Sequence, residues 1–176
     1  MKGFLFKSLL LAVLVNFTAC GDGNLEDLYP RQTCNMTEEE KTTQKALDIE
    51  VIEDHFEKNN INLADYKTTS SGLHYKTLVE GSGDLIKEGN KVDVHYIGKL
   101  LDGYKFDSSY DRAKALTITV GKHEVIPGWE EVLQLMKEGE EVRVYIPSYL
   151  AYGKCARPGI PAYSVLMFDI KVVEKF

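Results

Sequence analysis

The hydrophobic residues of this chain change their period at Gly72, from a helical to an alternating pattern. Before this point Ala46, Ile49, Ile52 and Phe56 recur at steps of three and four, which predicts one amphipathic helix. After it, apolar and polar residues alternate in five runs, which predicts strands with one buried face. These runs begin at Leu73, Val92, Leu116, Val142 and Leu166. We therefore expect an antiparallel sheet behind an N-terminal helical part.

One further helix is expected inside the strand region. It begins at Pro127, a residue favoured in the first turn of helices, and ends at Gly139. Its apolar stripe contains Trp129, Val132, Leu133 and Met136. The sequence thus predicts one short helix that covers the buried face of one sheet.

Composition limits the classes of function. The chain has 176 residues, of which 44% are hydrophobic and 27% are charged, as in an ordinary globular protein with one domain and a small appendage. A formal net charge of −6 disfavours nucleic acid and anionic membrane surfaces as partners. The histidines have no metal-ligand spacing, and no phosphate-binding loop is present. We expect no metal and no cofactor.

The N-terminus has the pattern of a secretory signal peptide. Lys2 and Lys7 precede an apolar run over residues 9–15, which is too short to span a bilayer. Cys20 follows small Thr18 and Ala19, and this resembles a bacterial lipobox, although Phe17 replaces the usual leucine. We expect a lipoprotein-type signal peptide over 1–19 and an envelope protein anchored by lipid at Cys20, at the outer membrane or the periplasmic face. A conventionally cleaved, soluble secreted form is the alternative.

Residues 20–36 are rich in glycine, asparagine and aspartate without apolar periodicity, which predicts a flexible tether. Thr37 and Glu40 then form a capping-box pattern that opens the helix, and Asn59-Asn60 ends it, so that helix and connector occupy 37–66. The apolar stripe of the helix is expected to dock on its own domain. A dimer contact or a substrate-holding arm is the alternative, but the helix is short for a dimerisation arm, and we expect a monomer.

The stretch 92–129 places several aromatic residues and the dipeptide Phe106-Asp107 on short alternating strands. This pattern predicts an apolar pocket with one polar corner. Such a pocket suits a ligand that is desolvated and held by a few hydrogen bonds. It indicates conformational chemistry rather than hydrolysis.

Five short motifs follow one another in order: VHYIG around Tyr96, KFDSS with Phe106 and Asp107, VIPGW from Val125 to Trp129, AYG with Tyr152, and LMFD with Phe168. As a set they resemble the FKBP-type peptidyl-prolyl cis-trans isomerases, and the resemblance covers residues 67–176. It implies an α+β fold, in which a curved antiparallel sheet of about five to six strands is half-wrapped around one short α-helix. The N-terminal helix is an extension of this domain.

The resemblance also implies an enzyme that accelerates rotation about X-Pro bonds in envelope or secreted proteins, without a covalent intermediate. The expected catalytic positions are Asp107, Tyr152, Phe106 and Tyr96. The expected substrate-binding positions are Trp129 as the pocket floor, Val125, Ile126, Phe168, Leu116, and Ile160 in a loop that folds over the peptide. Tyr96 and Arg112 are expected to hold the Asp107 carboxylate.

Proline-containing polypeptides are the expected partners, with macrolide inhibitors as further ligands. Leu116, Leu150 and Arg157 replace a phenylalanine, a tyrosine and a histidine of the best-known members, and the loop around Ile160 is shorter. These departures leave the residue preference before proline and the macrolide affinity open. The alternative function is a non-catalytic peptide-binding module or a chaperone that holds unfolded chains.

With Cys20 lipidated, Cys34 and Cys155 remain as an even pair in a compartment that permits disulfides. Either they form a bridge or they are two free thiols. A bridge ties the tether to the loop beside the pocket.

Overall fold

The computed structural model describes residues 34–176. The expected signal peptide over 1–19, the lipidation site Cys20 and most of the tether lie outside the described residues. Within the described residues, no helix has the length and apolar character needed to cross a membrane.

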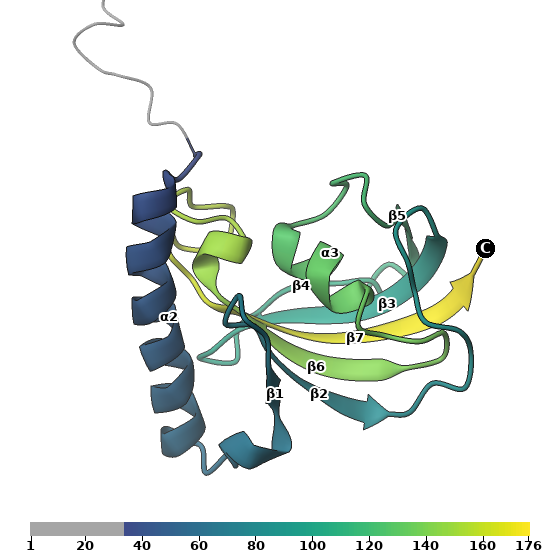
Figure 1. Cartoon of the computed structure of the whole chain (residues 1–176), viewed down its shortest axis with the longest axis horizontal. Coiled ribbons are helices and arrows are strands. Elements are labelled where there is room, and N and C mark those ends of the chain that lie inside the picture. The colour runs from purple at the N-terminus through teal and green to yellow at the C-terminus, as the bar shows by residue number, and fades with distance from the viewer. Residues whose placement is uncertain (1–33) are drawn as a thin grey trace, which may run out of the picture. The chain divides into compact units, whose positions relative to one another are not determined.

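A seven-stranded sheet carries the fold, and every pairing in it is antiparallel (Figure 1). The order is β1-β2-β6-β7-β3-β4, and β5 also pairs with β3. The strands are β1 (Lys67–Thr68), β2 (His74–Val79), β3 (Lys91–Leu100), β4 (Lys105–Ser108), β5 (Leu116–Thr119), β6 (Glu141–Ile146) and β7 (Leu166–Lys175). The predicted α+β class is confirmed.

The five predicted runs correspond to β2, β3, β5, β6 and β7. The two additional strands are short: β1 has two exposed residues, and β4 has four residues that include the Phe106-Asp107 motif. Neither is long enough to show the alternation on which the prediction depended. Both are held in place by pairing with a longer neighbour.

The helix α3 (Pro127–Leu133) lies on one face of the curved sheet (Figure 1). The predicted stripe Trp129, Val132, Leu133 and Met136 is buried in the main core. The regular helix ends at Leu133, earlier than predicted. The next residues form tighter turns, because the N–H of Met136 donates to the carbonyl of Leu133 at 3.1 Å.

The helix α2 (Glu38–Lys58) begins with the predicted capping box. The Thr37 hydroxyl accepts from the Glu40 N–H at 3.1 Å, and the Glu40 carboxylate accepts from the Thr37 N–H at 2.7 Å. Asn59 caps the C-terminal end of the helix. The short 3-10 helix η1 (Leu63–Asp65) then connects it to β1. Figure 1 shows α2 alongside the end of the sheet.

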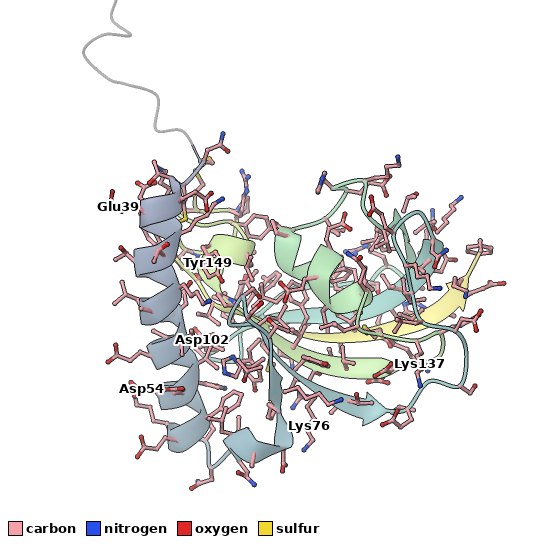
Figure 2. All side chains as sticks on the ribbon, viewed as in Figure 1. Glu39, Asp54, Lys76, Asp102, Lys137 and Tyr149 are labelled. Atoms are coloured by element: carbon pink, nitrogen blue, oxygen red, sulfur yellow. A yellow bond between two sulfur atoms is a disulfide. The ribbon has the colours of Figure 1, made fainter. Side chains whose placement is uncertain are left out.

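The inner side of α2 packs on its own domain, which confirms the docking interpretation. Ile52 and Phe56 form a second apolar cluster with Tyr145 of β6 and Val165. Glu39 and Asp54 lie on the side of α2 that faces away from the sheet (Figure 2). The predicted stripe was wrong at its first position, however, since Ala46 is exposed.

A buried carboxylate in the middle of α2 extends the docked face. Asp48 is only 1% exposed and accepts hydrogen bonds from the N–H and the hydroxyl of Ser148, at 2.7 and 2.8 Å, and from the Gln44 amide at 2.8 Å. Burial raises the pKa of Asp48 above its ordinary value, although these hydrogen bonds act in the opposite direction. Ser148 begins the 3-10 helix η2 (Ser148–Leu150). The carboxylate therefore ties α2 to the segment that leads to Tyr152.

A disulfide forms a second connection to this segment. The structure joins Cys34 and Cys155, which are 121 positions apart, in a bridge with an S–S distance of 2.05 Å. Lys154 pairs with Glu40 at 3.2 Å beside it. The residues on both sides of Tyr152 are thus connected to the N-terminal part of the chain.

We predict that Asp48→Ala lowers the free energy of unfolding by about 2–3 kcal/mol, because it leaves the buried N–H and hydroxyl of Ser148 without their acceptor. Urea denaturation of the full chain measures this loss. Glu50→Ala is the matched control on the exposed side of α2 and is expected to change stability by less than about 0.5 kcal/mol. Equal effects of the two substitutions would show that Asp48 does not anchor the helix.

Candidate functional site

A cavity of about 460 Å³ lies beside α3, and almost all of the expected site residues line it. These are Tyr96, Phe106, Asp107, Leu116, Val125, Ile126, Trp129, Tyr152 and Phe168. Chain segments far apart in sequence thus meet at one place. The wall also contains His123, Glu124, Ala151 and Arg157, which sequence reasoning did not assign to the pocket.

Aromatic rings in edge-to-face contact form the floor of the cavity. Trp129 is 3% exposed, and its ring lies 5.0 Å from that of Tyr96 and 5.3 Å from that of Phe168, with interplanar angles of 88° and 87°. Phe106 contacts Phe168 in the same way at 5.5 Å. This arrangement brings the edge of one ring to the face of another, which is favourable for aromatic pairs. The floor of the cavity is therefore made largely of the apolar surfaces of aromatic rings.

Gly98, near the C-terminal end of β3, makes room for two of these rings. A Cβ atom added there would lie 2.7 Å from ring atoms of both Phe106 and Phe168. This is closer than carbon atoms can pack. The glycine of the VHYIG motif was therefore a signal for the cavity wall that the sequence analysis did not use.

The polar corner is centred on Asp107 of β4. Its carboxylate accepts from the Tyr96 hydroxyl at 2.5 Å and from the Ser108 N–H at 2.8 Å, and it forms an ion pair with Arg112. The Arg112 guanidinium also donates to the Tyr96 hydroxyl oxygen at 2.7 Å. Both partners expected for Asp107 are thus in place, and they also contact each other.

These contacts keep Asp107 ionised. Partial burial raises the pKa of its carboxyl, but the hydrogen bonds from Tyr96 and Arg112 lower it by more, so that the net pKa lies below the ordinary value. Burial and the neighbouring carboxylate raise the pKa of Tyr96 to about 12. Over the neutral range the corner therefore presents a carboxylate next to a protonated phenol.

Ser109 supports this corner from beneath. It is fully buried, and its hydroxyl accepts from the Tyr96 N–H at 2.8 Å and lies 2.9 Å from Nδ1 of His95. The second serine of the KFDSS motif thus fixes β3 against the segment that follows Asp107. Sequence reasoning assigned no role to Ser109.

Among the hydrogen-bond donors at the cavity, the backbone N–H of Ile126 and the hydroxyl of Tyr152 form no bond to any of residues 34–176. Ile126 has extended backbone angles (φ −61°, ψ 150°) just before Pro127, as expected for a residue that precedes proline. The cavity therefore offers a substrate both a backbone donor and a side-chain donor.

Ile160 is the exception among the expected site residues. It is 6% exposed, belongs to the main core, and does not line the cavity. A tight turn with reciprocal backbone hydrogen bonds of 2.8 Å to Arg157 directs this part of the loop inward. Arg157 lines the cavity instead, with its guanidinium 5.4 Å from the centre of the Tyr152 ring.

No three His, Cys, Asp or Glu side chains of residues 34–176 lie close enough together to hold a metal ion.

Comparison with known proteins identifies the family. Residues 83–173 match the model of the FKBP-type peptidyl-prolyl cis-trans isomerase. The chain belongs to this family. Its FKBP domain therefore supplies the cavity, while α2 and the disulfide partner Cys34 precede the matched region.

Several relatives are FKBP-type isomerases named FkpA. That of Escherichia coli strain K12 is 43% identical over 108 residues, which is 61% of this chain and 39% of the relative. That of Buchnera aphidicola subsp. Acyrthosiphon pisum is 35% identical over 161 residues, 86% of this chain and 66% of the relative. The crystal structure of FkpA from Escherichia coli superposes with a TM-score of 0.64 and 37% identity, covering 77% of this chain and 62% of that one. The chain thus spans about two fifths of the length of the Escherichia coli relative.

We predict that the Asp107 carboxyl titrates below about 3.9, the ordinary value, and that Arg112→Gln raises its pKa. The pKa of Asp107 is lower in the folded state than in the unfolded state. Its ionised carboxylate therefore contributes to stability at pH values above the unfolded-state pKa, and this contribution is lost as pH falls through the folded-state pKa. It stays below about 1 kcal/mol, since the side chain is 40% exposed.

Carboxyl-carbon NMR across the acid range measures the titration. Lys105→Gln is the control, because Lys105 pairs with Asp111 instead. A parent midpoint at or above the ordinary value, or no change in Arg112→Gln, would contradict this assignment.

Proposed function

We propose that this protein is a peptidyl-prolyl cis-trans isomerase that accelerates rotation about X-Pro bonds in polypeptide substrates. The observation that carries the proposal is the cavity itself, in which an apolar aromatic floor stands next to a carboxylate that stays ionised. Membership of the FKBP family supports the same activity.

The chemistry needs no bond to be made or broken. Rotation about an X-Pro amide crosses a barrier of about 18–20 kcal/mol because the twisted amide loses its resonance. Water stabilises the planar, more charge-separated amide more than the twisted one, and transfer into an apolar cavity removes part of that difference. An acceleration of roughly 10⁵ requires only about 7 kcal/mol. Desolvation and a few hydrogen bonds are sufficient for this.

In the proposed complex the proline ring rests on Trp129, between Tyr96 and Phe168. The N–H of Ile126 and the hydroxyl of Tyr152 bind substrate carbonyls, since both donors are free among the described residues. This cavity is also where macrolide inhibitors would compete with substrate.

The Asp107 carboxylate lies beside the carbonyl that twists. As that carbonyl loses conjugation its carbon becomes more electrophilic, and a fixed negative charge next to it favours the twisted state. Tyr96 and Arg112 keep the carboxylate in position and ionised.

We also infer an envelope location with a lipid anchor at Cys20. The leader pattern of residues 1–20 supports it, and the bridge between Cys34 and Cys155 fits an oxidising compartment. The bacterial FkpA relatives are consistent with this.

The anchor predicts a mature chain that begins at Cys20 and is heavier than its sequence mass by a diacylglycerol and an acyl chain. Intact mass spectrometry of the protein from a bacterial membrane fraction measures this. Cys20→Ala should abolish the added mass and release the protein from the membrane. A parent chain of unmodified mass would leave the soluble secreted form as the correct description.

In a prolyl-peptide isomerisation assay on the full chain, we expect Asp107→Ala to lower kcat/KM about ten- to one-hundredfold, the value of a lost charge-assisted interaction. Trp129→Leu removes the aromatic floor, and we expect a loss of about tenfold or more. Asp54→Ala removes a carboxylate from the outer side of α2 and is the matched control, with activity unchanged (Figure 2). Absence of acceleration by the parent protein would refute the enzyme proposal.

The same preparation distinguishes the alternative of a binding module. Trp129 is the one tryptophan of the chain, so its fluorescence reports occupancy of the cavity directly. A saturable change on addition of a prolyl peptide, without acceleration of its isomerisation, would favour the binding module. Acceleration together with saturation supports the isomerase.

A further inference from the structure

A second cleft of about 320 Å³ adjoins the proposed isomerase site. The two share Ala151, Tyr152 and Arg157, so the same residues form the rim of one and a wall of the other. The opposite wall comes from residues 34–36 and from Lys41 of α2. This cleft is therefore built between the FKBP domain and the chain that precedes it.

Covalent and noncovalent contacts hold that opposite wall in place. The disulfide fixes Cys34 to Cys155, and Glu40 pairs with Lys154 at 3.2 Å. Met36 packs so closely on Gly153 that a Cβ atom at Gly153 would lie 2.8 Å from the methionine sulfur. The cleft thus has two fixed sides, as a binding site requires.

The charges on the lining are of one sign. Lys41 and Arg157 both line the cleft, and no carboxylate does. Lys41 contacts Glu38 at 2.8 Å, but the Glu38 side chain is 88% exposed and lies on the solvent side. Arg157 forms no ion pair with any of residues 34–176. The cleft therefore favours an anionic group.

We propose that this cleft is a subsite for the substrate chain that flanks the prolyl bond, and that Lys41 and Arg157 select a carboxylate side chain there. The inference rests on the proposed isomerase function. Because the cleft adjoins the proposed isomerase cavity, a substrate polypeptide bound in that cavity is the ligand expected in the cleft. A polypeptide whose proline lies on Trp129 leaves the site across its rim, and each extended residue covers about 3.3 Å. Tyr152 and Arg157 form the part of the rim that leads into the second cleft.

The residues that create this selectivity lie partly outside the family match. Residues 34–41 precede residue 83, where the match begins, and Arg157 stands at a position where the best-known FKBP members have histidine. The isomerase cavity thus lies within the matched domain, whereas the charged cleft also uses residues of the N-terminal part that precedes it.

The experiment measures kcat/KM of the full chain for prolyl peptides that differ at one flanking position. Glu, Gln or Lys is placed at each of the positions within about three residues on either side of proline, the reach of the cleft. At one or more positions we expect kcat/KM for the Glu peptide to be about two- to fivefold higher than for the Gln peptide, and kcat/KM for the Lys peptide to be lower than for the Gln peptide. The difference between the Glu and Gln peptides should decrease in high salt.

Lys41→Gln is the test variant, and Lys58→Gln is its matched control on the same helix, since Lys58 also pairs with an acid one turn away. We expect Lys41→Gln to reduce the Glu-to-Gln ratio about twofold and the double variant Lys41→Gln/Arg157→Gln to bring it to about one, while Lys58→Gln retains the parent ratio.

Failure of this inference is distinguishable from failure of the isomerase proposal. If the parent does not accelerate the Gln peptides, the isomerase function is refuted. If it accelerates them but the Glu-to-Gln ratio is one at every position, or if the ratio is the same in Lys41→Gln and Lys58→Gln, the charged subsite is refuted.

Discussion

The packing of Trp129 against Tyr96 and Phe168 is the contact on which the rest of the molecule depends. It joins α3 to β3 and β7 and so closes the core between helix and sheet. The same contact forms the floor of the cavity. It also orients Tyr96, whose hydroxyl reaches Asp107 and, with Arg112, keeps that carboxylate ionised. Stability and the proposed catalysis therefore use the same rings.

The N-terminal part of the chain is attached to the segment that surrounds Tyr152. Asp48 holds Ser148 before it, and Cys34 holds Cys155 after it. The position of Tyr152 is thus set from both sides by residues that lie outside the matched domain. The N-terminal part of the chain can therefore influence the rim of the cavity, while the floor of the cavity belongs to the matched domain.

Local sequence patterns predicted the α+β class, the five longer strands and the buried side of α3, because burial of one face imposes a period that can be read along the chain. The five motifs predicted most of the cavity lining, but not His123, Glu124 or Arg157, and Ile160, which was expected at the cavity, lies in the core. Local patterns could not predict that Asp48 is buried, since its partner Ser148 is 100 positions away. Nor could they decide the pairing of Cys34 with Cys155, which depends on where two distant loops meet. The inward position of Ile160 could not be predicted either, because the direction of its turn depends on packing against the core.

The most direct test of the central claim is exchange NMR of a short X-Pro peptide at equilibrium, with a catalytic amount of the full chain. Uncatalysed exchange takes tens of seconds or longer. We predict cross-peaks between the cis and trans forms within a mixing time of about one second, far shorter than uncatalysed exchange, with an unchanged cis-to-trans ratio. If the peptide binds, as line broadening and Trp129 fluorescence would show, but its exchange rate equals that of the free peptide, the cavity holds prolyl chains without isomerising them, and the proposed function is wrong.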